Sequence, residues 1–235
     1  MSSNASGFKN EKLISNELND RELKDINSNL QKFIKFISEN KSINVDESSV
    51  IKSHVISDNS CKADIQIKLN EKRPETYGIS IKKGSGNSIH QENISDFIKY
   101  IDELGASENQ LQAFNWFINS KTYSRQLKKE KPNRIKLMKD FLNTNKKILS
   151  KRFLKTGLVN YGFADYIYYG TPENGTWGEI DKVINSIITK YKPRATLPMG
   201  SLSLQAWNRT NEDKRHVLQV KWTSIKKDLN KIRGE

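Results

Sequence analysis

Lys62-Ala63-Asp64-Ile65-Gln66-Ile67 and Tyr77-Gly78-Ile79-Ser80-Ile81-Lys82 are the two stretches of this chain that decide its fold. In both, isoleucines alternate with polar residues, and this period of two is typical of a half-buried β-strand. Residues 70–76 lie between them and contain a proline among charged residues, which indicates a turn. We therefore predict a β-hairpin of two antiparallel strands.

The polar residues of this hairpin are suited to phosphodiester hydrolysis. In an antiparallel pair, Asp64 lies near the end of the second strand, where Ser80 and Lys82 share a face because they are two residues apart. Cutting a phosphodiester requires a hard divalent cation held by oxygen ligands, an activated water and positive charge near the phosphate. Asp64 and the backbone carbonyl of Ile81 are candidate metal ligands, and Lys82 is a candidate to orient or deprotonate the water. Taken alone, the same residues also fit an ordinary surface hairpin.

The composition is that of a basic protein. Among 235 residues, 40 Lys and Arg stand against 27 Asp and Glu, which gives a formal net charge of +13. Such a balance is the usual electrostatic signature of nucleic-acid binding, although a lysine-rich bias of the genome is an alternative. The composition predicts a partner that carries phosphates.

Cysteine and histidine usage excludes several kinds of site. The single cysteine, Cys61, allows no internal disulfide and no cysteine-rich zinc site, and the three histidines show no metal-ligand spacing. The chain has no run of about 18 apolar residues and its first residues are polar, so we expect neither a membrane span nor a signal peptide. We predict a cytoplasmic protein.

Apolar spacing along the rest of the chain predicts an α/β protein. Helices are expected near residues 10–18, 26–39, 91–104 and 179–191, with a basic helical region over 107–156. Further strands are expected in the second half of 45–56, in the aromatic run after Gly157, and in a C-terminal ribbon over 201–207 and 216–222. The predicted fold class is a central mixed β-sheet flanked by helices, with a basic helical insertion and a C-terminal β-ribbon.

No clear domain boundary is visible in the sequence, so we predict a single domain over residues 1–235. Within it, the catalytic core covers about 1–105, the basic helical region about 107–156, and a C-terminal DNA-contacting part about 157–235. The basic region is either a subdomain that grips the DNA backbone or a solvated face over a shared core.

Three segments together resemble a known family: Gly7-Phe8-Lys9-Asn10-Glu11-Lys12, then Lys62-Ala63-Asp64-Ile65, then Ile79-Ser80-Ile81-Lys82. This layout resembles the PD-(D/E)xK nuclease superfamily, and most closely its type II restriction endonucleases of the HinP/MspI group. The resemblance covers most of the first hundred residues, and residues 86–91 and 217–221 are similar to a DNA-facing loop and a closing strand of those enzymes. It implies a restriction-endonuclease-like fold and Mg²⁺-dependent cutting of double-stranded DNA at a short specific sequence.

The resemblance also implies roles for individual residues. Asp64 would be the metal-binding carboxylate, Lys82 the catalytic lysine, and Glu11 a helix-borne carboxylate that completes the metal site through water. Ser80 occupies a catalytic position at which the superfamily pattern has Asp or Glu, so the number of bound metals is left open. Glu92 is either a further acid of the site or an ordinary first-turn acid favoured by a helix dipole.

Recognising a DNA sequence requires amide or guanidinium side chains at base edges. The candidates lie in the loop after the second strand and in the C-terminal ribbon: Asn87, His90, Gln91, Gln205, Asn208 and Arg209. Each is also an ordinary polar loop residue, and His90 is alternatively a contact of the scissile phosphate. Trp207 and Trp222 are expected to pack within the ribbon, with wedging between bases as the alternative.

These observations lead us to expect a type II restriction endonuclease, a site-specific deoxyribonuclease with Mg²⁺ as cofactor. One alternative is another nuclease of the same superfamily that acts on methylated DNA, in repair or on junctions. A second alternative is a non-catalytic DNA-binding protein that uses the basic helices of residues 107–156. A palindromic target would favour a homodimer.

Overall fold

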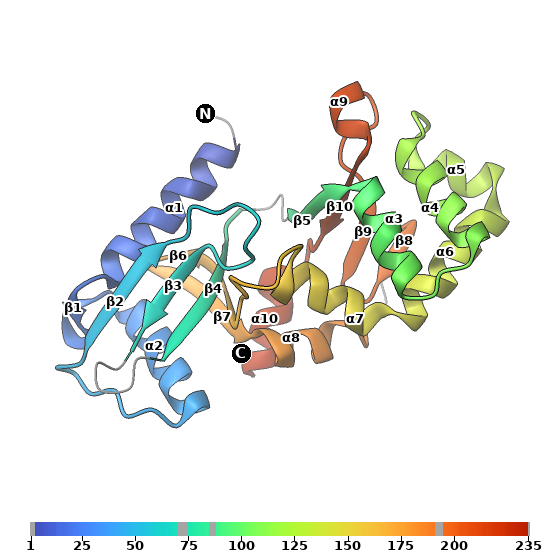
Figure 1. The fold of residues 1–235 in the computed structure, drawn as a ribbon. Helices are drawn as coiled ribbons and strands as arrows, with labels where there is room; N and C mark the ends of the chain where they lie inside the picture. Colours follow the sequence, from blue (N-terminus) through green and yellow to red (C-terminus); the bar gives the residue numbers. More distant parts are fainter. Residues whose placement is uncertain (1–2, 70–74, 85–87, 191–194, 235) are drawn as a thin grey trace. The chain divides into compact units, whose positions relative to one another are not determined.

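The computed structural model describes residues 3–69, 75–84, 88–190 and 195–234 (Figure 1). They form two compact units. The first unit comprises Met1–Ser85, Leu154–Val183 and Ile225–Glu235, and the second comprises Gly86–Phe153 and Ile184–Ser224. These units divide the chain differently from the expected segments, because residues 88–103 of the predicted core belong to the second unit. The expectation of a single domain stays a prediction.

A six-stranded mixed sheet is the centre of the first unit. Its order is β1-β2-β3-β4-β6-β7, and neighbouring strands are antiparallel except for β4 and β6, which are parallel. The strands are β1 (Arg21–Glu22), β2 (Val50–Val55), β3 (Ile65–Lys68), β4 (Thr76–Lys82), β6 (Tyr166–Thr171) and β7 (Asn174–Glu179). The mixed sheet and the antiparallel β3–β4 hairpin confirm the predicted fold class.

Helices pack on this sheet. α1 contacts β2, and both α2 and α10 contact β7. Their bounds are α1 (Ser3–Leu18), α2 (Ser28–Lys41) and α10 (Ile225–Arg233), and a short 3₁₀ helix, η1 (Leu23–Asp25), joins β1 to the segment before α2. The first two helices were predicted, whereas α10 was not.

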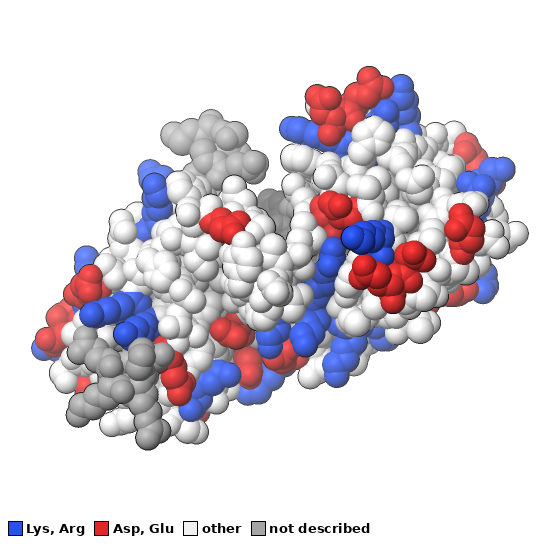
Figure 2. All heavy atoms as spheres, viewed as in Figure 1, with Lys and Arg blue, Asp and Glu red and all other residues white. Residues whose placement is uncertain are grey.

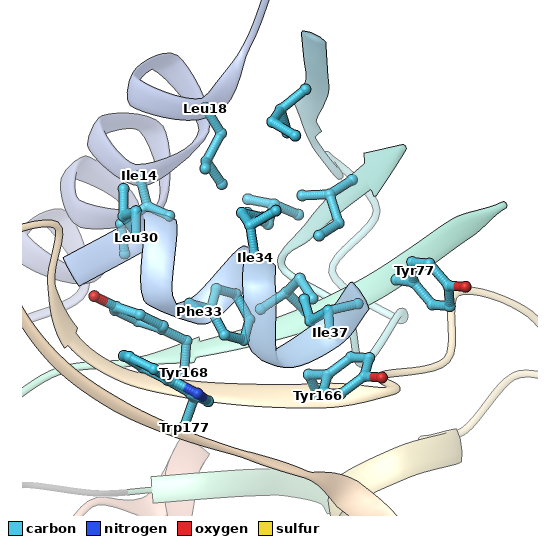
Figure 3. Packing of buried hydrophobic residues seen from close by; sticks show 14 of the residues in the cluster. Ile14, Leu18, Leu30, Phe33, Ile34, Ile37, Tyr77, Tyr166, Tyr168 and Trp177 are labelled. Atoms are coloured by element: carbon cyan, nitrogen blue, oxygen red, sulfur yellow. The ribbon is translucent and has the colours of Figure 1, made fainter. Parts of the chain in front are cut away.

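The core of the first unit is built around an aromatic side chain of α2. The Phe33 ring centroid lies 5.2 Å from that of Tyr168 and 5.4 Å from that of Trp177. Figure 3 shows Ile14 and Leu18 of α1 directed into the same core, and both are fully buried. Burial of such side chains stabilises a domain by about 1.5–3 kcal/mol each, so this core holds α1 at a fixed place against the sheet.

One expectation for the first unit is wrong in detail, and one of its strands was not predicted. Residues 157–165 form a loop, and the strand expected in this aromatic run begins only at Tyr166. Gly157 and Gly162 have φ angles of 70° and 61°, which are incompatible with an extended strand. The sequence also failed to predict β7, because its two glycines are poor strand formers.

The second unit contains an antiparallel sheet of order β5-β10-β9-β8. Its strands are β5 (Ser88–Asn93), β8 (Leu197–Met199), β9 (Leu202–Ala206) and β10 (Val217–Lys221). β9 and β10 confirm the predicted C-terminal ribbon. The expected loop up to Gln91 and the helix starting there are wrong, because residues 88–93 pair with β10 and the helix begins at Ile94.

Helices form the rest of the second unit and confirm the predicted helical pattern of residues 107–156. They are α3 (Ile94–Glu103), α4 (Glu108–Asn119), α5 (Ser124–Glu130), α6 (Pro132–Thr144), α7 (Lys146–Lys151) and α9 (Glu212–Arg215). The π-helical turn η2 (Arg152–Thr156) follows α7, and α8 (Ile180–Ile187) lies within the helix expected over 179–191; both elements include residues of each unit. Among the residues that the structure describes, no helix has the length and apolar character needed to cross a membrane.

Candidate active site

The β3–β4 hairpin brings polar residues of its two strands together. Ile65 is paired with Ile79, so Asp64, one residue before β3, lies across from Ser80. The Asp64 N–H donates to the Ile79 carbonyl at 2.9 Å and extends the ladder by one residue. The expected approach of Asp64 to Ser80 and Lys82 is therefore present.

One oxygen of Asp64 accepts three hydrogen bonds. Its Oδ2 accepts from the Ile81 N–H at 2.5 Å, from Lys82 Nζ at 2.8 Å and from the Ser80 hydroxyl at 3.1 Å. Lys82 Nζ also donates to the Ile81 carbonyl at 3.0 Å. The Asp64 and Lys82 side chains remain 23% and 21% exposed. The ammonium thus joins the two oxygens predicted as metal ligands, at a place open to solvent.

Glu11 of α1 contributes a second carboxylate. The pKa of Glu11 is raised to about 7, first by burial and then by the negative charge of Asp64, while Lys82 acts in the opposite direction. α1 is held in place next to the sheet by Asn10, whose Nδ2 donates to the Gly170 carbonyl at 2.9 Å. The fold therefore places Glu11 within electrostatic reach of residues that are far away in the sequence.

The oxygen atoms of this site fit a hard divalent cation. Mg²⁺ is commonly held by one or two carboxylates and keeps several waters, and Asp64, Glu11 and the Ile81 carbonyl supply oxygens of the right kind. The described part of the chain contains no cluster of three or more His, Cys, Asp or Glu residues that could hold a metal. Ser80 is 4% exposed and donates to Asp64, so its hydroxyl positions the carboxylate.

A row of amide side chains crosses the sheet of the second unit. Gln205 Nε2 donates to Gln219 Oε1 at 3.2 Å, and Gln219 Nε2 donates to Ser88 Oγ at 3.0 Å. Gln91 Nε2 donates to the same hydroxyl at 3.2 Å. Gln205 and Gln91 were predicted as base contacts from separate segments, and β10 brings them to either side of Gln219. We call Ser88, Gln91, Gln205 and Gln219 the amide row.

Comparison with known proteins bears on the fold of this chain. No protein-family model matches the chain, and no protein of curated function matches it. Among solved structures, the restriction endonuclease MspI in complex with its cognate DNA is similar, with a TM-score of 0.62 and 16% sequence identity over 94% of this chain and 93% of that chain. The chain has the fold of a restriction endonuclease. The resemblance found in the sequence is confirmed at the level of the fold.

Within this restriction-endonuclease fold, His90 has partners other than solvent. It is 5% exposed, its Nε2 lies 3.1 Å from Glu92 Oε1, and its ring centroid lies 4.9 Å from that of Phe153. Glu92 lies in β5 and not in the first turn of a helix, and Arg152 Nη2 donates to its Oε2 at 2.7 Å. Burial raises the pKa of Glu92, but His90 and Arg152 outweigh burial and hold it below its usual value. His90 and Glu92 therefore belong to a buried charged cluster.

Three other predicted DNA contacts differ in their accessibility. Arg209 is 8% exposed and donates to the carbonyls of Phe117 and Ser120 at 2.6 and 2.8 Å, and burial lowers its pKa to about 10. Asn208 is exposed, and its Oδ1 accepts from the Thr210 N–H at 3.1 Å. Asn87 lies outside the described residues. Arg209 thus secures the end of α4 in this structure.

The two tryptophans of the ribbon differ in their exposure. Trp222 is fully buried, which confirms its packing role. Trp207 is half-buried, and Lys214 Nζ lies 4.7 Å from the centroid of its ring.

The positive charge is dispersed over the surface that Figure 2 presents. Lysine and arginine side chains are spread over this face and interleaved with acidic ones. Net charge alone therefore does not locate a DNA-binding surface on this face.

Proposed function

We propose that this protein is a Mg²⁺-dependent endonuclease that hydrolyses phosphodiester bonds of double-stranded DNA at a short specific sequence. The observation that carries the proposal is the convergence of Asp64, Ser80 and Lys82, together with Glu11, at the end of the hairpin where β3 begins and β4 ends. The similarity in fold to MspI, which was solved with its cognate DNA, supports the same reading.

The chain itself supplies charge and positioning to the reaction. The Lys82 ammonium is partly exposed, and next to a bound phosphodiester it would stabilise the negative charge that develops on the phosphate oxygens. Asp64 and the Ile81 carbonyl hold this ammonium in place, and Ser80 holds Asp64. Asp64, Glu11 and the Ile81 carbonyl are the groups that would hold Mg²⁺, which would supply further positive charge and make a nearby water more acidic.

The amide row is the surface that we assign to sequence recognition. Glutamine side chains can donate to and accept from the edge of an adenine simultaneously, which makes them suitable for reading bases. Gln91 is exposed and Gln205 is half-buried, whereas Gln219 is 4% exposed. Gln219 forms hydrogen bonds with both Gln205 and Ser88. Gln219 would therefore orient the two outer amides for contact with base edges.

The direct test is to incubate the purified protein with plasmid DNA in Mg²⁺ and in EDTA, using unmethylated and cytosine-methylated plasmid. We expect sharp fragments that require Mg²⁺ and whose sequenced ends share one short sequence. Comparison of the two plasmids gives the methylation preference. Binding of both plasmids without cutting of either would favour the alternative of a DNA-binding protein.

The sequence mapped in this experiment also predicts the oligomeric state of the protein on DNA. A palindromic sequence at the mapped ends would favour a homodimer, because a two-fold axis of the protein then matches that of the DNA. Sedimentation of the protein with a duplex of the mapped sequence measures the number of chains bound.

A further inference from the structure

One loop of the first unit exposes a group of large apolar side chains. Within residues 157–165, which we call the aromatic loop, Leu158, Tyr161 and Phe163 are 45%, 54% and 39% exposed. Exposed apolar side chains that occur together mark surfaces that contact a partner. The aromatic loop is therefore a candidate surface for contact with a partner, separate from the residues proposed to act on the phosphodiester.

Hydrogen bonds fix the aromatic loop to both strands of the catalytic hairpin. The Gly162 carbonyl accepts from the N–H of Ala63 at 3.0 Å, directly before Asp64. On β4, the Asp165 N–H donates to the Gly78 carbonyl at 2.7 Å, and the Asp165 carboxylate accepts from the Gly78 N–H at 2.9 Å. The loop is thus presented at a defined place beside the candidate active site.

The loop lies on the catalytic face of β4. Gly78, Ser80 and Lys82 share this face because they alternate along the strand. A Cβ atom at Gly78 would lie 1.9 Å from the Phe163 carbonyl oxygen, so the loop covers the face directly at this glycine. Two residues along a strand span about 7 Å, which corresponds to about two base-pair rises of DNA. A DNA strand at Ser80 would thus have its neighbouring nucleotides close to Phe163.

The charges around the loop favour contact with bases. The Tyr161 hydroxyl donates to Asp58 Oδ2 at 2.8 Å, and this carboxylate would repel a phosphate brought close to the ring. At the beginning of the loop, Gly157 packs against the stem of Lys62, since a Cβ there would lie 3.1 Å from the lysine Cγ. Exposed aromatic rings are typical of surfaces on which nucleic-acid bases stack.

On the basis of the proposed nuclease function, we propose that the aromatic loop is a non-ionic contact surface for double-stranded DNA, in which Tyr161 and Phe163 stack on or wedge between bases next to the cut. Leu158 extends the apolar surface. This surface adds a contact to the proposed reaction that contributes affinity without neutralising phosphates.

The test measures binding of a labelled duplex that contains the mapped cut sequence, in EDTA and over a series of salt concentrations. We expect Tyr161→Ala and Phe163→Ala each to weaken binding about ten-fold, within the range for loss of one stacked base. The slope of log affinity against log salt should stay unchanged, because no phosphate contact is lost. Tyr161→Phe is the matched control: it removes the bond to Asp58, keeps the ring, and should retain wild-type affinity.

Two results would overturn the proposal. If wild-type protein cuts the duplex but both alanine variants bind it as tightly as wild type, the loop has no role in DNA contact and the nuclease function stands. If the variants alter self-association in sedimentation and leave DNA affinity unchanged, the loop is an interface between copies. The melting temperatures of the two alanine variants separate loss of contact from loss of folding, because exposed side chains can be removed without unfolding and both variants should melt like the wild type.

Failure of the proposed function itself gives a different result. In that case the wild-type protein neither cuts plasmid nor yields a mapped sequence, and the binding experiment has no specific duplex to use. The proposal for the aromatic loop then falls together with the nuclease assignment.

Discussion

At the scale of single residues, the candidate active site depends on how one lysine is shared between two oxygen atoms. Lys82 Nζ donates to Asp64 Oδ2 and to the Ile81 carbonyl, which are the atoms proposed to bind a cation. The lysine therefore occupies, with its own positive charge, the ligands that a metal would use. Removing the carboxylate and removing the ammonium should have opposite effects on metal affinity.

Asp64→Asn is expected to reduce the rate of DNA cleavage at least 10²- to 10³-fold, which is typical for loss of one charge-stabilising group at an active site. The substitution keeps the side-chain shape, so DNA binding in EDTA should be close to wild type. Single-turnover cleavage of plasmid and a binding isotherm measure the two effects. Full cleavage activity in this variant would exclude Asp64 as a metal ligand.

Lys82→Met is expected to abolish cleavage and to tighten Ca²⁺ binding about ten-fold, a change equivalent to about 1.4 kcal/mol. The reason is that the variant removes a positive charge that competes with the cation for Asp64. Calorimetric titration of both proteins with Ca²⁺ measures the affinity, and the Asp64→Asn variant should bind Ca²⁺ more weakly than either. Equal Ca²⁺ affinities of wild type and Lys82→Met would contradict the competition.

Glu11 makes stability depend on pH. Its pKa rises from the usual 4.5 to about 7 on folding, so folding takes up a proton between these values and stability falls as pH rises through this window. Glu11→Gln stays neutral and should melt at a higher temperature than wild type at pH 8, in EDTA, with little difference at pH 4. A melting temperature lower than wild type at pH 8 would show that the ionised carboxylate is well paired.

At the scale of elements, β5 is joined to the end of α7 by a buried ion pair. The Glu92 side chain is fully buried, and Arg152, at the start of η2, pairs with it and also lies 3.9 Å from the centroid of the Tyr100 ring in α3. A buried charge that loses its partner is strongly destabilising, whereas an exposed pair contributes little. Loss of the buried ion pair should therefore lower the stability of the second unit much more than loss of an exposed ion pair.

Arg152→Met is expected to lower the free energy of unfolding by about 3 kcal/mol, because Glu92 stays buried and keeps its contact with His90 but loses its guanidinium partner. Urea unfolding followed by circular dichroism measures the change. Lys136→Met, which breaks the exposed pair with Asp140 at 2.8 Å, is the matched control and should change stability by less than about 1 kcal/mol. Similar small losses in both variants would show that the buried pair is not required for folding.

At the scale of the whole molecule, the excess of positive charge should govern binding to DNA of any sequence. The 40 basic residues exceed the 27 acidic residues, but both kinds are interleaved on the surface seen in Figure 2. Basic side chains dispersed in this way attract the DNA backbone through several separate phosphate contacts. It contributes affinity and little selectivity.

Affinity for a duplex without the target sequence is expected to fall steeply with salt. Each neutralised phosphate contributes a slope of about −0.9 to log affinity against log salt. Fluorescence anisotropy of a labelled duplex, measured at several salt concentrations between about 50 and 200 mM, gives the affinity and hence this slope. An affinity that does not change over this range would contradict electrostatic binding of the backbone.

The sequence by itself determined the features that depend on neighbouring residues. Alternation in residues 62–67 and 77–82 predicted the hairpin and the approach of Asp64 to Lys82, because side chains on a strand repeat every two residues. Helical periodicity predicted α1, α2 and the helices of residues 107–156. The similarity in fold to a restriction endonuclease was also predicted, from three short segments.

Only the tertiary structure decided the features that depend on contacts between distant segments. The pairing of β5 with β10 turned an expected loop into a strand, buried His90 and placed Gln219 between Gln91 and Gln205. The position of α1 raised the pKa of Glu11 beside Asp64. Strand pairing and burial are set by the free energy of packing the whole chain, which overrides local propensity, and local spacing therefore could not predict them.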